Sequence, residues 1–258
     1  MKAIASESNP GFRHWLRLAT VPRAVREAGQ TLAEGIHLAQ AALAANIAVE
    51  AVIMRKGAAH AELEPLLSQL GGVAAFELVP ALYDRLAPVE HGAGVLLLLP
   101  VPAPRAARST RADMVYLDGI QDPGNAGAVL RCAAAAGVRH VLAGPGTAAL
   151  WAPKVLRAAM GAHFRLAVHE RVAAAELTAL LDGPWYAAVA HGAPSLWTQQ
   201  LPAGPMGWIF GAEGSGPSLE ALAASRQQVC IPTSAAVESL NVAAAAAICL
   251  FERMRRAN

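Results

Sequence analysis

The window LDGIQDPGNAGAVLRCAAAAGV, residues 117–138, places an amide, Asn125, and a guanidinium, Arg131, in an apolar context. It begins like the end of a strand and continues as a helix after the DPGNAG turn. A guanidinium keeps its proton, so Arg131 could bind a phosphate or stabilise an oxyanion but would be a poor base. Six residues correspond to about 600° of helix rotation, so the two side chains meet only if Asn125 folds back from the loop. On this window alone, a surface arginine is an equally good interpretation.

A second window, GAEGSGPS at residues 211–218, contains three glycines that would let backbone amides approach a ligand. It has no GxGxxG pattern and no lysine follows, so it is neither a dinucleotide fingerprint nor a phosphate loop. Glu213 would repel a phosphate, whereas it could hydrogen-bond a hydroxyl or accept a cation. On this window alone, a plain turn is the favoured interpretation.

The third window, IPTSAAVESLNVAAAAAICLFERMRR at residues 231–256, leads from a strand end into a long helix. Ser239 and Asn241 are expected in its first turn, where capping explains one polar residue but leaves Asn241 as a surplus amide. The final arginines suit a helix C-terminus. An apolar stripe recurs at helical spacing and comprises Leu240, Ala244, Ile248, Phe251 and Met254.

Strands and helices alternate after residue 113, which predicts a mostly parallel sheet covered on both faces. The expected strands are 114–118, 138–144, 164–168, 185–190, 207–211 and 228–232, and the expected helices are 125–136, 153–160, 172–182 and 237–256. Loops in the three windows, a GPG loop and an AHGAP loop all follow strands. They should therefore meet at the carboxyl edge of the sheet, where ligands bind.

Residues 1–100 read as a smaller α/β unit. A helix is expected over 31–46, with Thr31 as N-cap and Glu34 three residues later as in a capping box. The other expected elements are one or two helices within 11–30, a strand at 48–54, a helix at 61–72 and a strand at 95–99. The segment 100–111, with three prolines and three arginines, is the best linker.

Composition narrows the classes of protein. Apolar runs such as residues 95–99 are far too short for a membrane span, and the N-terminus lacks the apolar stretch of a signal peptide, so we expect a cytoplasmic protein without membrane contact. The three cysteines, Cys132, Cys230 and Cys249, are widely spaced and read as buried free thiols. No metal-ligand spacing is found.

Cations concentrate in two zones although the formal net charge is only +2. Residues 1–60 hold seven cationic against four acidic residues, and residues 101–171 hold nine against four. Such zones suit a polyanion, although arginine outnumbers lysine 18 to 3, so an arginine-rich solvated surface is an alternative.

Taken together, the three windows resemble the three motifs of the SpoU (TrmH-like) family of RNA 2′-O-ribose methyltransferases, within the SPOUT superfamily. Their order and spacing match over roughly residues 113–256. Upstream, TLAEGIHLAQAAL resembles the start of the small substrate-binding domain of many members. The departure is residues 233–236, where many members have methionine and a glycine-containing turn.

The resemblance implies an α/β fold in which a SPOUT-type, mostly parallel sheet with a C-terminal trefoil knot follows a small ribosomal-protein-like α/β domain. The implied division is an RNA substrate-binding domain over 1–100, a linker over 101–112 and the methyltransferase domain over 113–258. It also implies a homodimer formed through the methyltransferase domain and the C-terminal helix, for which the apolar stripe is a candidate.

The implied cofactor is S-adenosylmethionine, bound by Gly211, Gly214, Ile231 and Leu240. Implied catalytic residues are Arg131, Asn125, Glu213, Ser239 and Asn241. In this reading Arg131 binds an RNA phosphate and stabilises the alkoxide, and Asn125 holds Arg131. Glu213, Ser239 and Asn241 orient the ribose and the arginine.

Only RNA carries the 2′-hydroxyl, so RNA is the implied partner. Candidates for binding its phosphates are Arg13, Arg17, Arg23, Arg26, Lys154 and Arg157. Ribosomal RNA is preferred, because the N-terminal domain resembles those of members that act on it. Transfer-RNA methylation, a non-catalytic RNA-binding role on the same fold and an antibiotic-resistance role stay open; a dinucleotide oxidoreductase is disfavoured because DPGNAG is a poor phosphate-binding fingerprint.

Overall fold

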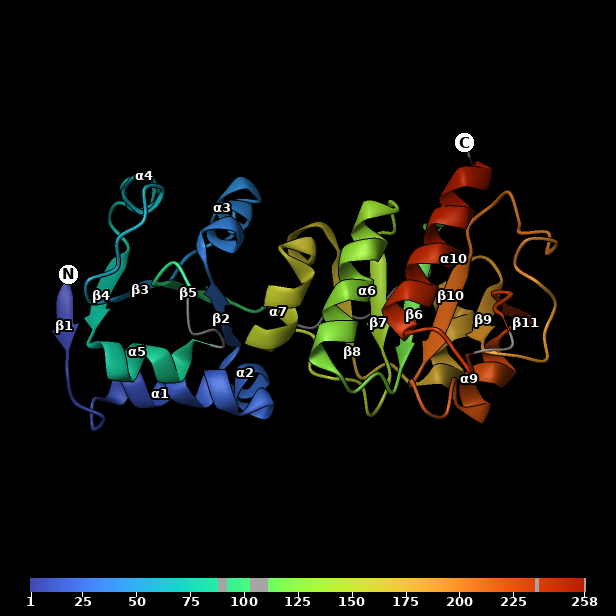
Figure 1. Cartoon of the computed structure of the whole chain (residues 1–258), viewed down its shortest axis with the longest axis horizontal. Helices are drawn as coiled ribbons and strands as arrows, with labels where there is room; N and C mark the ends of the chain where they lie inside the picture. The colour runs from blue at the N-terminus through green and yellow to red at the C-terminus, as the bar shows by residue number, and fades with distance from the viewer. Residues whose placement is uncertain (88–91, 103–110, 235–236, 258) are drawn as a thin grey trace. The chain divides into compact units, whose positions relative to one another are not determined.

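The computed structural model describes residues 1–87, 92–102, 111–234 and 237–257 and divides the chain into two compact units (Figure 1). Unit 1 comprises Met1–Ala103 and Trp151–Phe164, and unit 2 comprises Pro104–Leu150 and Arg165–Asn258. The first division falls inside the expected linker 101–112, most of which lies outside the described residues. The segment 151–164, which the sequence placed in the methyltransferase domain, belongs to unit 1.

Unit 1 is a five-stranded sheet with helices. Its strand order is β1-β4-β3-β5-β2, in which β5 is antiparallel to β3 and β2 and the other pairs are parallel. The strands are β1 Lys2–Ile4, β2 Gln30–Glu34, β3 Ala51–Arg55, β4 Ala74–Leu78 and β5 Val95–Pro100. The helices are α1 Pro10–Thr20, α2 Pro22–Ala28, α3 Ile36–Ala44, α4 Leu63–Gln69, α5 Pro80–Leu86 and α7 Pro153–Ala159.

The helix expected to start at Thr31 is wrong in its first residues. Thr31 and Glu34 lie in β2, and α3 starts only at Ile36, after Gly35 with φ of 95°. Pairing of β2 with β5 buries this stretch and overrides the local capping-box pattern. The Thr31 hydroxyl donates to the carbonyl of Trp151 at 2.6 Å, so it fastens the segment 151–164 to the unit 1 sheet.

Unit 2 is an all-parallel, six-stranded sheet, as the alternation of strands and helices predicted. Its order is β11-β9-β10-β6-β7-β8. The strands are β6 Met114–Asp118, β7 His140–Ala143, β8 Ala167–Glu170, β9 Trp185–Val189, β10 Gly207–Gly211 and β11 Gln227–Cys230. Two expectations were wrong in detail. The strand expected over 164–168 is β8, which starts only at Ala167, after a 3₁₀ turn over residues 162–165. The helix expected over 172–182 is replaced by two shorter elements, η2 Ala174–Glu176 and α8 Leu177–Leu180.

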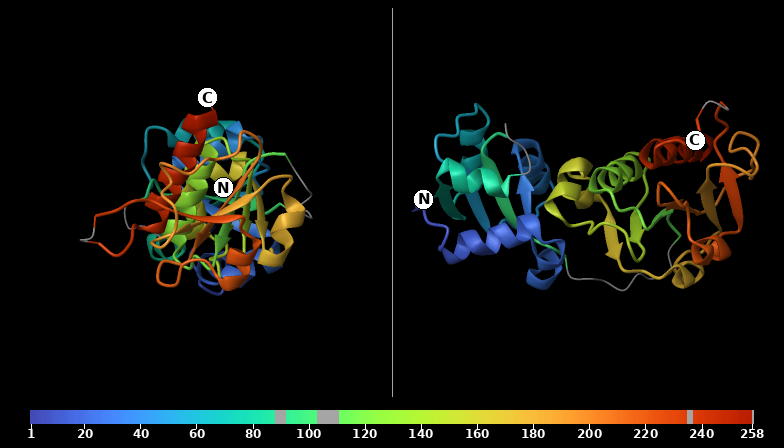
Figure 2. Two further views of the ribbon diagram at one scale, coloured as in Figure 1. Left: turned by 90° about the vertical axis from the view of Figure 1, so that its right-hand side faces the viewer. Right: turned by 60° about the horizontal axis from the view of Figure 1, so that its bottom comes forward.

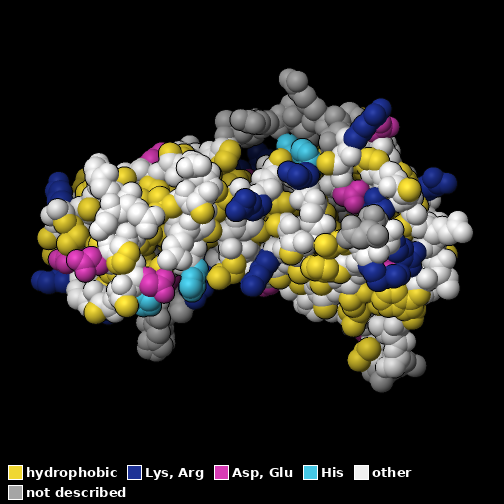
Figure 3. Space-filling view, turned by 90° about the horizontal axis from the view of Figure 1, so that it is seen from above, with side chains coloured by type: hydrophobic (Ala, Val, Ile, Leu, Met, Phe, Trp, Pro, Cys, Tyr) yellow, Lys and Arg dark blue, Asp and Glu magenta, His cyan; other side chains and the backbone are white. Residues whose placement is uncertain are grey.

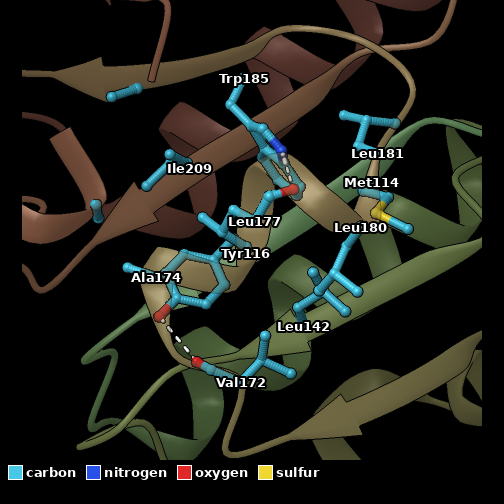
Figure 4. Close-up of a cluster of buried hydrophobic side chains, with 12 residues drawn as sticks. Met114, Tyr116, Leu142, Val172, Ala174, Leu177, Leu180, Leu181, Trp185 and Ile209 are labelled. Carbon is cyan, nitrogen blue, oxygen red and sulfur yellow. Dashed lines mark hydrogen bonds between the residues drawn. The ribbon is translucent and has the colours of Figure 1, made fainter. Parts of the chain in front are cut away.

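Alternate side chains of the unit 2 strands face two different layers. On one face, Tyr116, Leu142, Trp185 and Ile209 pack with the segment 172–181 in a buried cluster (Figure 4). The buried polar atoms there are satisfied, since the Tyr116 hydroxyl donates to the Val172 carbonyl at 3.1 Å and the Trp185 indole donates to the Leu177 carbonyl at 2.9 Å. Helices α6 Pro123–Ala135 and α10 Val242–Ala257 pack together on the opposite face (Figure 2).

Of the three cysteines, Cys249 is buried, whereas Cys132 and Cys230 are only half-buried, and all three are free thiols. None of the helices in the described part of the chain is long and apolar enough to cross a membrane. The described residues also contain no group of three or more potential metal ligands.

Candidate functional site

The three sequence windows meet in one row of hydrogen-bonded side chains. The Asn125 amide nitrogen, in the first turn of α6, donates to a carboxylate oxygen of Glu213 at 2.5 Å. The Asn241 amide nitrogen donates to the Asn125 amide oxygen at 3.0 Å. A carboxylate can only accept, so the contact with Glu213 fixes which way the Asn125 amide points. The Glu213–Asn125–Asn241 row thus contains one side chain from each window.

Asn241 also caps the last helix. Its side-chain oxygen accepts hydrogen bonds from the backbone N–H groups of Ala243 at 3.0 Å and Ala244 at 3.3 Å. Because α10 begins at Val242, Ser239 and Asn241 precede the helix rather than lie in its first turn, which corrects the sequence-based boundary. Asn241 therefore acts both as a helix cap, through its side-chain oxygen, and as an additional amide donor, through the nitrogen that bonds Asn125.

Arg131 projects from α6 as an exposed side chain. Within the described residues its guanidinium has neither a hydrogen bond nor an ion pair. The expected contact with Asn125 is absent, and the amide of Asn125 instead bonds Glu213 and Asn241. The positive charge is therefore available to an external anion.

The glycine-rich loop after β10 is folded tightly on itself. A side chain at Gly211 would place its Cβ 2.0 Å from the nitrogen of Pro217, so only glycine fits there. Asp118, at the end of the neighbouring β6, holds the far end of the loop by accepting from the Ser218 N–H at 2.6 Å. The space that a side chain at Gly211 would need is therefore filled by the backbone of the same loop. At Gly214, in contrast, an added Cβ would meet no atom within 4 Å.

A cavity of about 700 Å³ lies at the carboxyl edge of the unit 2 sheet. It is formed by the loops after β9, β10 and β11 and by the start of α10. The four predicted cofactor residues and two of the predicted catalytic residues line it, namely Gly211, Gly214, Ile231, Leu240, Glu213 and Ser239. The prediction that strand-following loops meet at this edge is confirmed for the loops after β9, β10 and β11, whereas the GPG loop after β7 does not line the cavity.

Other residues of the cavity received no role from the sequence. Ala190 and His191 belong to the AHGAP loop after β9, whose position after a strand was the only available signal. Phe210 and Leu222 add apolar wall. The described lining residues include neither lysine nor arginine, so this is not a phosphate pocket; its glycine-rich backbone and apolar side chains suit an uncharged ring system.

All six candidates for phosphate binding lie in unit 1, where several already have partners. Arg17 and Arg23 contact Glu27, at 3.6 and 2.6 Å. Arg157 forms an ion pair with the buried Glu34 at 2.7 Å, whereas Lys154 is exposed. Over the face seen in Figure 3, cationic side chains are dispersed among polar and hydrophobic ones.

The apolar stripe of the last helix points away from the core. Side chains that bury α10 against the unit are Val242, Ala246, Cys249, Leu250 and Arg253. The predicted stripe lies on a different side, where Leu240, Phe251 and Met254 are 37%, 46% and 39% exposed. Phe251 and Met254 therefore lie on the exposed side of α10, whereas Leu240 precedes the helix and lines the cavity.

Arg253, one of the final arginines that the sequence assigned to the helix C-terminus, is a buried anchor. Its guanidinium donates to Asp113 at 3.0 Å and to the carbonyls of Pro202 and Gly204 at 2.6 and 2.7 Å. Arg256 similarly donates to the carbonyl of Leu196 at 2.8 Å. Together the two arginines tie the end of α10 to the long connection between β9 and β10.

A parallel α/β sheet with a cavity at its carboxyl edge, beside a row of polar side chains, is typical of an α/β protein that binds a small ligand at that edge. Residues 113–251 match the sequence model of the SpoU rRNA Methylase family. The chain is 30% identical over 256 residues to the 23S rRNA (guanosine(2553)-2'-O)-methyltransferase RlmP of Bacillus subtilis, covering 97% of this chain and 98% of that protein. The chain therefore belongs to the SpoU rRNA Methylase family.

Solved structures of methyltransferases have a similar fold. A crystal structure of an RNA 2′-O ribose methyltransferase superimposes with a TM-score of 0.83 at 28% identity, over 98% of both chains. The SpoU methyltransferase AviRb from Streptomyces viridochromogenes, in complex with AdoMet, superimposes with a TM-score of 0.85 over 96% of this chain and 98% of that one; at 22% identity it supports the fold.

Proposed function

We propose that the chain transfers the methyl group of S-adenosylmethionine to a ribose 2′-hydroxyl of ribosomal RNA. The observation that carries the proposal is the Glu213–Asn125–Asn241 row, which brings the three family motifs together beside one cavity. Membership of the family and the name of the Bacillus subtilis relative supply the reaction and the RNA class.

The cavity fits the cofactor in size and chemistry. Its volume of about 700 Å³ lies within the usual range for small-molecule sites. Ile231 and Leu240 would supply apolar walls to the adenine, and the backbone at Gly211 and Gly214 would supply polar partners. S-adenosylmethionine has no phosphate, in keeping with a lining that lacks lysine and arginine. When bound, it supplies a methyl group activated by a positively charged sulfur.

The residues of the chain would then align and polarise the nucleophile. A ribose hydroxyl is weak until its proton leaves, so help for the developing alkoxide and alignment are the main requirements. Arg131 would bind the adjacent RNA phosphate and stabilise the alkoxide, with that phosphate or a water accepting the proton. Asn125, which accepts a hydrogen bond from Asn241, holds Glu213 in position, and Glu213 with Ser239 would orient the ribose.

Substrate capture is assigned to unit 1, as a ribosomal-protein-like domain that binds RNA. Exposed Lys154 and the arginines of α1 and α2 would contact phosphates, which makes binding salt-dependent. Arg157 would contribute less directly, since its guanidinium already holds Glu34.

The proposal includes the assembly expected of the family. The exposed apolar side of α10, at Phe251 and Met254, is a suitable surface for a homodimer. A C-terminal trefoil knot would explain how the segment before α10 reaches the cavity, and a cytoplasmic location would suit a ribosomal-RNA substrate.

The test is methyl transfer from labelled S-adenosylmethionine to bulk bacterial RNA, followed by mapping of ribose methylations with and without the gene. Loss of one ribosomal site is expected; loss of a transfer-RNA site instead would overturn the substrate assignment. Arg131→Ala should reduce transfer at least about 100-fold, because it removes a charge from the alkoxide site. Arg139→Ala, an exposed arginine of the same unit, is the matched control. Full activity of Arg131→Ala would refute the catalytic assignment.

A further inference from the structure

The cofactor cavity has a charge pattern that methyl transfer alone does not require. Two carboxylates, Glu213 and Glu238, line it, and the only described lining residue able to carry a positive charge is His191. The cavity is therefore biased toward positively charged ligands.

Glu238 is the uncommitted member of the pair. Glu213 accepts a hydrogen bond from Asn125, whereas the exposed carboxylate of Glu238 has no hydrogen bond or ion pair with any described residue. Glu238 also lines an adjoining hollow of about 560 Å³, together with Ile231 and Thr233. It thus belongs to the wall shared by two adjacent spaces, where a ligand group can approach it.

The proposed reaction changes the charge of the ligand in this cavity. The carbon–sulfur bond of the sulfonium breaks as the carbon–oxygen bond to the ribose forms, and the bonding pair stays on sulfur. The hydroxyl proton passes to phosphate or water, and S-adenosylhomocysteine, a neutral thioether, is left. Substrate and product share the adenosine, the ammonium and the carboxylate, so interactions with those groups largely cancel in the ratio of their affinities.

We propose that Glu238 is a specificity-determining residue that recognises the sulfonium charge and favours S-adenosylmethionine over S-adenosylhomocysteine. This rests on the proposed function, because the cavity must hold the cofactor. Attraction by a carboxylate is lost when the charge is lost, so Glu238 promotes exchange of spent product for fresh cofactor. Solvent-exposed ion pairs are weak, so the expected effect on the affinity ratio is about two- to fivefold.

Titration calorimetry on the full chain tests the proposal with S-adenosylmethionine, S-adenosylhomocysteine and sinefungin, in which an amine-bearing carbon keeps a positive charge at the sulfur position. In Glu238→Gln, the preference for S-adenosylmethionine over S-adenosylhomocysteine should fall about two- to fivefold, and sinefungin should weaken in parallel with S-adenosylmethionine. Glu220→Gln removes an equal charge from an exposed position of unit 2 outside the cavity and should leave the ratio unchanged. Added salt should reduce the wild-type preference more than that of Glu238→Gln.

Three outcomes would count against the proposal. An unchanged ratio in Glu238→Gln overturns it while leaving the proposed function intact. An equal loss of affinity for all three ligands assigns Glu238 to a group that they share and also overturns it. If the folded wild-type chain, verified by circular dichroism, binds none of the three ligands, the proposed function itself fails.

Discussion

Asn241 performs two tasks with one amide, and Asn241→Ser separates them. A serine hydroxyl can still cap α10, but it cannot reproduce the amide nitrogen that donates to Asn125 at 3.0 Å. Asn241→Ala loses both. The lost cap, with its bonds to Ala243 and Ala244, should cost about 1 kcal/mol, and the exposed side-chain bond to Asn125 roughly 0.5 kcal/mol more.

Urea unfolding and methyl-transfer kinetics together test this reasoning. Asn241→Ser should unfold within about 0.5 kcal/mol of the wild type, because it retains the cap. If the row positions the reacting groups, its kcat should nevertheless fall at least about tenfold, with little change in the Kd for cofactor. Combining Asn241→Ser with Asn125→Ala should add little further loss of kcat, since either change breaks the row. Wild-type kcat in Asn241→Ser would refute the idea that the row positions catalytic groups.

Two further predictions concern stability. Arg253→Met should lower the free energy of unfolding by about 3 kcal/mol in urea titrations, because it removes the partner of Asp113 and of two carbonyls. Arg255→Met, which removes an exposed arginine that pairs with Glu252, is the control, and equal losses in the two variants would contradict the anchor. Burial raises the pKa of Glu34 above its ordinary value of 4.5, although Arg157 opposes the shift. Its stabilising contribution is thus complete below the unfolded-state pKa and declines as pH rises through the folded-state pKa, so Glu34→Gln should flatten the fall in stability over that range; an unchanged pH profile would contradict it.

The sequence predicted the parts of the fold that depend on local periodicity. The strands of unit 2 alternate with helices and are continuously apolar, so the parallel sheet and the edge where its loops meet were both accessible. Thr31 and Glu34 show the limit, because their spacing imitates a helix cap while the decisive interaction is pairing with β5, more than sixty residues away.

The candidate site was predicted in its membership but not in its connections. The motif windows supplied Asn125, Glu213 and Asn241, yet helix geometry suggested only a conditional contact between Asn125 and Arg131. The actual partners of Asn125 are 88 and 116 residues away, and no local pattern specifies a hydrogen bond across such separations. His191 and Glu238 received no role in the cavity from the sequence, although the AHGAP loop and the third window that contain them were expected at the carboxyl edge of the sheet.

The assignment of residues 151–164 to unit 1 has a consequence for dissecting the protein. The chain passes between the units at 103–104, at 150–151 and again at 164–165. A fragment starting at residue 113 would carry Val155, Leu156 and Ala159, which are buried in the whole chain, without the unit 1 sheet to which Thr31 fastens their segment. The complementary fragment, residues 1–100, would lack α7 and expose the apolar surface that α7 covers. Neither unit can be released from the chain by a single cut, so the roles of the two units should be separated by point substitution in the intact chain.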